Sequence, residues 1–86
     1  MTTYRYEFNI IVEVMNYIRN NDDAIPTRIM YACRLTHART KEILNILLKN
    51  ALIDVEKNSR GQSVYTITLK GMEFRNHAVD ALGMIS

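Results

Sequence analysis

The segment from Arg34 to Ile53, RLTHARTKEILNILLKNALI, changes character halfway along its length. Its first eight residues hold three cations and a histidine with no acidic residue, whereas most of the remaining twelve are leucine, isoleucine or alanine. Because Thr36 is a good helix N-cap, the segment predicts a helix over residues 37–51. We expect its C-terminal half to be buried, and a helix that only had to pack would not need cations at its start.

The basic residues of the chain are gathered into two segments. Residues 24–41 contain no Asp or Glu and carry a charge of +4, and residues 57–63 carry +2, although the whole chain is only +2. Residues 42–56 between them are net −2. This distribution indicates a local basic patch and not a general basic bias, and such a patch is typical of a nucleic-acid-binding surface.

The composition is that of an ordinary globular protein. The chain has 86 residues, of which 48% are hydrophobic and 23% charged, which predicts one domain over residues 1–86 with a small core. An oligomer would be a natural supplement to so small a core. No apolar run approaches the roughly 18 residues of a membrane span, and the N-terminus lacks the order of a signal peptide. We therefore expect an intracellular, cytoplasmic protein with no membrane partner.

The first helix is predicted over residues 4–20 and has two apolar faces. At about 100° per residue, one face holds Tyr4, Phe8, Ile11, Val12, Met15 and Ile18. The nearly opposite face holds Tyr6, Ile10, Val14 and Tyr17. A helix that is apolar over most of its circumference needs burial on two sides. We expect one monomer to cover only the first face, so the second is predicted to be a subunit interface.

Two further helices complete the predicted core. Pro26 suits the first turn of a helix over residues 26–33, in which Ile29, Met30 and Cys33 are expected to point inward. Cys33 is interpreted as a small buried residue, with a disulfide between subunits as the alternative. In the helix over residues 37–51 the expected core face is Thr40, Leu44, Leu47, Leu48 and Ala51.

Beyond Ile53 the period of the apolar residues changes from that of a helix to that of a strand. IDVEK and SVYTIT predict two β-strands joined by the turn NSRGQ, because both are rich in β-branched residues and alternate in polarity. Val55, Tyr65 and Ile67 are expected to face inward.

The final helix is predicted over about residues 69–84, with Thr68 as its N-cap. Gly71, in its first turn, is expected to allow a close approach to the hairpin. Apolar residues at spacings of 4, 3 and 4 form a short a/d seam, namely Phe74, Ala78, Ala81 and Ile85. This seam is predicted to pair with a second copy of the chain. The alternative is that it packs on the chain's own first helix.

Helix, helix, turn, helix, hairpin and helix is the order of an α+β winged helix-turn-helix domain. Such a domain has a three-helix core and a two-stranded β-hairpin wing, here over about residues 53–68, and the last helix would serve for dimerisation. In this architecture the third helix inserts its N-terminal half into the major groove of DNA and packs its C-terminal half in the core. The helix N-terminus also favours phosphate. The cationic start and apolar end of the helix over residues 37–51 match this division.

The chain resembles the small winged-helix regulators of archaea and archaeal viruses over nearly its whole length. The resemblance depends on IMYACRLT, ILNILLKNALI and YTITLKGMEF, and its most specific part is the pattern of Tyr65, Ile67, Thr68 and Gly71. Ala51 departs from this family, which usually has a glycine closing the third helix. The resemblance implies a homodimer that binds double-stranded DNA as a transcription regulator, in the host cytoplasm if the source is viral.

The candidate DNA contacts lie mainly in the two basic segments. The predicted base contacts are Arg39, Asn45, Ala38 and Lys41. Arg39 is the first candidate because a guanidinium pairs with guanine O6 and N7, and Asn45 could pair with adenine. The predicted contacts to the DNA backbone are Arg28, Thr36, His37, Thr40, Lys57, Arg60 and Gln62. Glu42 would repel phosphate unless it accepts from a cytosine amine or pairs with Arg39 or Lys49.

Other chemistries find little support in the sequence. Cys33 and His37 could suggest a nucleophile and a base, but the turn at Leu35 should separate them, and no Asp or Asn is nearby to orient the imidazole. Cys33, His37 and His77 have no recognised metal-ligand spacing. We therefore predict no enzyme activity, cofactor, metal or small-molecule ligand. The alternative function is a winged-helix module for protein–protein interaction within a larger complex.

Overall fold

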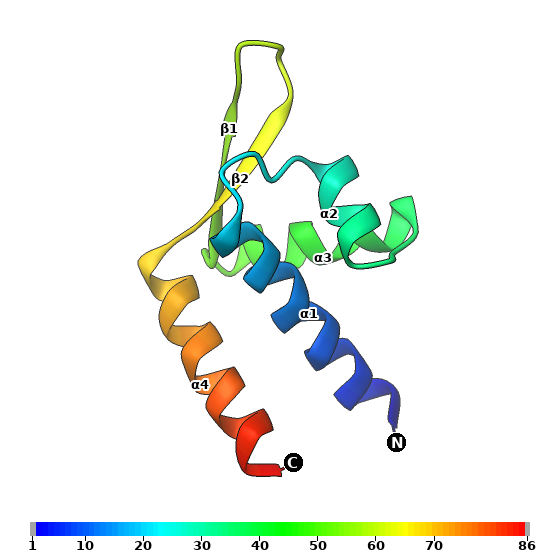
Figure 1. The fold of residues 1–86 in the computed structure, drawn as a ribbon, viewed down its shortest axis with the longest axis vertical. Helices are drawn as coiled ribbons and strands as arrows, with labels where there is room; N and C mark the ends of the chain where they lie inside the picture. The colour runs from blue at the N-terminus through cyan, green and yellow to red at the C-terminus, as the bar shows by residue number, and fades with distance from the viewer. Residues whose placement is uncertain (1, 86) are drawn as a thin grey trace.

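A computed structural model describes the backbone of residues 2–85 and the side chains of residues 9–77. The elements are α1 (Thr2–Asn20), α2 (Pro26–Ala32), α3 (His37–Lys49), β1 (Ile53–Lys57), β2 (Ser63–Ile67) and α4 (Leu69–Ile85). This order confirms the predicted α+β winged helix-turn-helix arrangement. Figure 1 shows the hairpin extending beyond the three packed helices α1, α2 and α3, with α4 leaving from its base.

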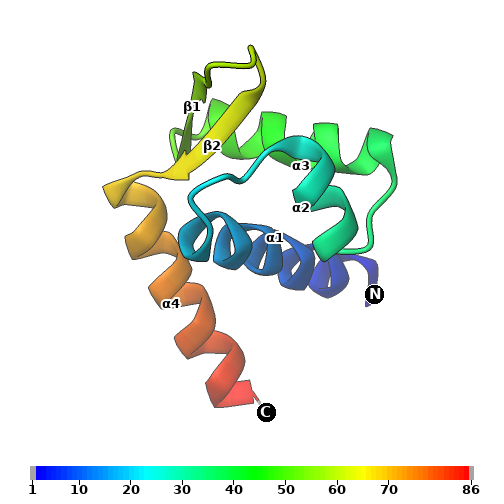
Figure 2. The same ribbon diagram turned by 45° about the horizontal axis from the view of Figure 1, so that its top comes forward.

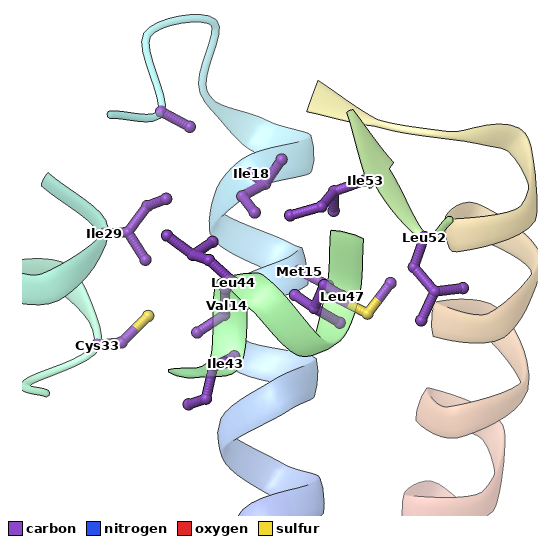
Figure 3. Packing of buried hydrophobic residues seen from close by; sticks show 11 residues of the cluster. Val14, Met15, Ile18, Ile29, Cys33, Ile43, Leu44, Leu47, Leu52 and Ile53 are labelled. Carbon is purple, nitrogen blue, oxygen red and sulfur yellow. The ribbon is translucent and has the colours of Figure 1, made fainter. Parts of the chain in front are cut away.

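The core lies where α1, α2, α3 and the base of the hairpin meet, and Figure 3 shows its side chains gathered between these elements. Its buried members are Val14, Met15, Ile18, Ala24, Ile29, Cys33, Ile43, Leu44, Leu47, Leu52 and Ile53. On α3 the prediction was right for Thr40, Leu44 and Leu47 but missed Ile43, which is 1% exposed. Ala51 is exposed, because α3 ends at Lys49 and the chain turns before this residue.

α1 is covered on more sides than the sequence analysis expected. Val14, assigned to the dimer interface, is 0% exposed in the chain's own core, so that assignment is wrong. Ile10 and Tyr17, from the same predicted face, are partly buried and also pack against the core. The reason is that α2, β2 and α4 all contact α1. Tyr6, the fourth residue of this face, lies outside the described side chains. Among the described residues no helix is both long and apolar enough to cross a membrane.

Both α2 and α3 are followed by a left-handed residue that is not glycine. Arg34 has φ 56° and Ala51 has φ 59°. After α3, the Leu52 amide donates to the Leu47 carbonyl at 2.9 Å, and the Ala51 amide donates to the Leu48 carbonyl at 3.0 Å. These are the two hydrogen bonds of a Schellman motif. The helix therefore closes in the usual way without the glycine that the family resemblance implies.

We expect Ala51→Gly to stabilise the fold by about 0.5–1 kcal/mol. Removing Cβ relieves about 1–2 kcal/mol of left-handed strain, and the greater freedom of glycine in the unfolded chain offsets about 0.4–1 kcal/mol of this gain. Urea denaturation measures the difference. Ala32→Gly is the control, because Ala32 lies at the right-handed end of α2, where glycine should lower stability. A loss of stability in Ala51→Gly would contradict the strain argument.

The hairpin is attached to the core only at its base. Ile53 pairs with Ile67, and Val55 with Tyr65, so these four residues share one face. Val55 is nevertheless 42% exposed, which corrects the expectation that it packs inward, because the strands extend past the helices at this point (Figure 1). The Tyr65 amide donates to the Ala24 carbonyl at 3.0 Å, which ties β2 to the loop before α2.

α4 begins where the hairpin returns to the core. The Gly71 amide donates to the Thr68 hydroxyl at 2.9 Å, which confirms Thr68 as the N-cap. A Cβ added at Gly71 would lie 2.0 Å from the Leu52 carbonyl oxygen, so the predicted close approach is confirmed.

The first turns of α4 contact α1, and the helix then turns away from it. The Arg75 guanidinium donates to the side-chain carbonyl of Asn16 on α1. In Figure 2, α4 leaves this region at an angle to α1. Phe74, the first residue of the predicted seam, is 37% exposed. The other three seam residues, Ala78, Ala81 and Ile85, lie outside the described side chains.

Candidate nucleic-acid interface

The side of α3 that faces away from the core is polar. With the core face centred near Thr40 and Leu44, a rotation of about 100° per residue places Ala38, Glu42 and Asn45 on the outward side. The exposed residues of the helix are His37, Ala38, Lys41, Glu42, Asn45, Ile46 and Lys49. Apart from Ile46, which is 41% exposed, α3 therefore presents small, polar and charged side chains to solvent.

Four of the residues predicted to contact DNA lie along a cleft of about 210 Å³, namely His37, Thr40, Lys41 and Asn45. Its remaining walls are Pro26, Thr27 and Met30 of α2, Leu44 of α3 and Tyr65 of β2. Burial raises the pKa of Tyr65 above its ordinary value. Its phenolic hydroxyl can donate or accept a hydrogen bond. The cleft thus combines hydrogen-bonding groups and a cation with an apolar lining.

Two threonines predicted to contact phosphate have structural roles at the start of α3. The Thr36 hydroxyl accepts from the Arg39 amide at 3.1 Å, which confirms the N-cap, and Thr36 remains exposed. Thr40 is 3% exposed, and its hydroxyl donates to the Thr36 carbonyl at 2.8 Å. The prediction of Thr40 as a DNA contact is therefore wrong, because its side chain is buried and already bonded within the helix.

Arg39 lies apart from the other predicted base contacts. It is about 160° around the helix from Lys41, and the structure does not place it in the cleft. Its side chain is 29% exposed, and its Nη1 lies 2.6 Å from Oε1 of Glu42. Glu42 thus pairs with one of the two cations considered for it. The Nη1 of Arg39 is therefore engaged by Glu42 and is not directed into the cleft.

Asn58 holds the turn between the two strands, which is the tip of the wing. Its Oδ1 accepts from the amides of Arg60 and Gln62, both at 2.9 Å. Its Nδ2 donates to the side-chain oxygen of Gln62 at 3.1 Å. Gly61 adopts φ 76°, which closes the turn. Arg60 and Gln62 therefore lie exposed in an ordered turn, and Lys57 is exposed at the end of β1 beside it.

A second groove, of about 330 Å³, brings Arg28 next to the wing. It is lined by Asp23, Ile25, Arg28, Asn58, Ser59, Arg60 and Gln62. Arg28 Nε lies 3.6 Å from Asp23 Oδ2, and both side chains are more than half exposed, so this pair opens readily. Because α2 lines the cleft through Pro26 and Thr27 and the groove through Arg28, the two hollows are adjacent. Arg34, counted in the first basic segment, lies elsewhere, in a groove beside α1.

Cys33 is a core residue. Burial raises the pKa of its thiol to about 11, with a smaller contribution from the Glu13 carboxylate. A buried, protonated thiol is a poor nucleophile, and a disulfide between subunits would require this part of the core to open. Within the described part of the chain, no three His, Cys, Asp or Glu side chains converge in a way that could hold a metal ion.

A sequence model of the family described as winged helix-turn-helix matches residues 4–85. No curated protein gives a significant sequence match.

Solved structures share the fold at low sequence identity. A protein of unknown function from Listeria innocua is 22% identical, with a TM-score of 0.73 over 83% of this chain and 50% of that one. MepR, a transcription regulator of the Staphylococcus aureus multidrug efflux pump MepA, is 15% identical, with a TM-score of 0.79 over 90% of this chain and 58% of that one. Sso10a-2, a DNA-binding protein from Sulfolobus solfataricus, is 23% identical, with a TM-score of 0.70 over 85% of this chain and 78% of that one. The chain thus spans about half the length of the first of these proteins and 58% of the second.

Proposed function

Because the chain belongs to the winged helix-turn-helix family, we propose that it is an intracellular transcription regulator that binds a specific sequence of double-stranded DNA as a homodimer. The main support is the meeting of three separate segments on one surface. The cleft joins α2, α3 and β2, and the adjacent groove joins α2 to the wing. On this proposal α3 enters the major groove, and wing residues 57–63 follow the backbone or the minor groove.

The proposed base contacts come from the outward side of α3. Asn45 has the amide that pairs with adenine, Lys41 can donate to guanine O6 and N7, and Ala38 can contact a thymine methyl group. The proposed backbone contacts are Arg28, Thr36, His37, Lys57, Arg60 and Gln62. The narrower resemblance to regulators of archaea and archaeal viruses remains a prediction; the solved structures of similar fold come from bacteria and from an archaeon.

The proposed dimer interface centres on α4. Val14 is excluded because it is buried in the monomer, and Ile10 and Tyr17 are already partly covered. What remains of the predicted interface is the α4 seam together with Tyr6. The departure of α4 from α1 (Figure 2) and the 76% exposure of Leu69 at its start support an interface on this helix.

Selection from a random pool of double-stranded DNA, with light scattering on the purified protein, tests the proposal. A homodimer should enrich a roughly palindromic motif whose half-sites are about 10 base pairs apart, or a multiple of this. A monomer that enriches no motif would contradict the proposal. It would favour the alternative of a protein–protein interaction module, which the net charge of only +2 also allows.

A further inference from the structure

An acidic residue occupies the outward side of the helix proposed to enter the major groove. Glu42 lies about 200° around α3 from Thr40, so it is almost opposite the core. Its side chain is 61% exposed. The proposed readers Ala38 and Asn45 stand four residues before it and three after it, on the same side of the helix. A carboxylate at this position meets DNA at the bases or is repelled by the phosphates.

The ion pair with Arg39 fixes the carboxylate of Glu42. Arg39 Nη1 lies 2.6 Å from Oε1, and the Arg39 side chain is only 29% exposed, so the guanidinium is the more anchored partner. An ionised carboxylate has about four acceptor positions on its two oxygens. The pair with Arg39 therefore leaves Oε2 able to accept a second hydrogen bond.

The major groove offers a matching donor. Cytosine presents the N4 amine there, and Glu is a known acceptor for it. Guanine presents O6 and N7 and thymine presents O4, all of which are acceptors, and adenine presents its N6 amine beside the N7 acceptor, which would repel a carboxylate. We infer that Glu42 reads a cytosine and that Arg39 is a positioning residue that holds the Glu42 carboxylate toward it. This inference rests on the proposed function. The carboxylate would attract the cytosine amine and repel the acceptor edges of guanine and thymine. Attraction to the preferred base and repulsion of the others would thus both contribute to specificity.

Selection from random double-stranded DNA with the wild type and with Glu42→Gln tests the inference. Because Gln pairs with adenine, the preferred base at one position of each half-site should change from cytosine to adenine. The preference for cytosine there should fall roughly tenfold. Asp23→Asn is the matched control, because it also removes one carboxylate paired to an arginine, but beside the wing. It should raise affinity for all sequences alike and leave the motif unchanged.

Arg39→Ala separates a positioning role from a reading role. If Arg39 positions Glu42, the preference weakens at the same cytosine, whereas loss of a purely structural contact would leave the motif unchanged. Thermal unfolding of each variant establishes that it is folded. An unchanged motif in Glu42→Gln, or relaxation at a separate guanine in Arg39→Ala, would overturn the inference while leaving the proposed function intact. A wild-type protein that binds no DNA would overturn the proposed function itself, and the inference with it.

Discussion

Gly71→Ala is expected to destabilise the fold by about 3 kcal/mol, the upper end of the usual range for overpacking. The added methyl group would lie 2.0 Å from the Leu52 carbonyl oxygen and 2.9 Å from Ile67 Cγ1. A backbone oxygen cannot rotate away as a side chain can. The same oxygen accepts from the Thr68 amide at 3.1 Å, so moving α4 outward would also break the bond that joins this helix to the end of α3.

Thermal unfolding followed by circular dichroism measures the effect. For a domain of this size the loss corresponds to a fall in Tm of about 12–24 °C. Gly61→Ala is the matched control, because a Cβ there meets nothing within 4 Å while φ is 76°. Only left-handed strain of about 1–2 kcal/mol applies to the control. Equal losses in the two variants would show that α4 moves away from the hairpin at little energetic cost.

The elements and their ends could be predicted because their signals are local. Thr36 and Thr68 each lie three residues before the amide that they cap, so both helix starts follow from short stretches of sequence. The change of apolar period after Ile53 likewise identified the hairpin. Even Gly71 could be assigned its role, because a glycine in the first turn of a helix has few other uses.

Predictions that depended on how the elements cover one another were less successful. Val14 was assigned to a subunit interface because a helix with two apolar faces was assumed to be covered by its own chain on one face only. Thr40 is polar and close to the cations in sequence, but α3 turns it into the core. Val55 lies on the correct face of the hairpin, but at a point where the core no longer reaches.

Some parts of the candidate site have short sequence signals of their own, and others have none. Asn58 is followed by Ser, Arg and Gly, and an Asn side chain commonly bonds the backbone amide two residues on. This rule identifies the residue that orders the wing. Thr27 of the cleft gave no such signal, because α2 has seven residues, too few to define a face by periodicity. Arg39 and Glu42 are three residues apart on one helix, so their ion pair could be predicted as one of two alternatives for Glu42, the other being a pair with Lys49.

The affinity for DNA is expected to fall about a thousandfold between 50 and 200 mM salt. Three of the proposed backbone contacts are cations, Arg28, Lys57 and Arg60, which makes six in a homodimer. Each neutralised phosphate contributes about −0.9 to the slope of log affinity against log salt concentration, so six contribute about −5. Fluorescence anisotropy with a labelled duplex that carries the selected motif measures the slope. An affinity that is insensitive to salt would show that the basic patch is only a solvated surface.

Variants of the wing show how many of these contacts come from its tip. Lys57→Gln and Arg60→Gln should each reduce the slope by about 2, because a homodimer loses two contacts. Lys70→Gln is the control, because Lys70 lies at the start of α4 beside Ile11 and Phe74, and it should leave the slope unchanged. If log affinity has the same dependence on log salt concentration in the two wing variants and in Lys70→Gln, the proposed contacts of the wing are contradicted.

Asn58→Ala separates the placement of the wing cations from their presence. The substitution keeps every charge but removes the side-chain bonds to the amides of Arg60 and Gln62. Because the wing tip contributes little to the core, the free energy of unfolding should change far less than in Gly71→Ala. The slope should nevertheless fall toward that of the Lys57 and Arg60 variants, since cations on a loose turn are less often close to phosphate. A slope equal to that of the wild type would mean that charge alone, without an ordered turn, accounts for the contribution of the wing.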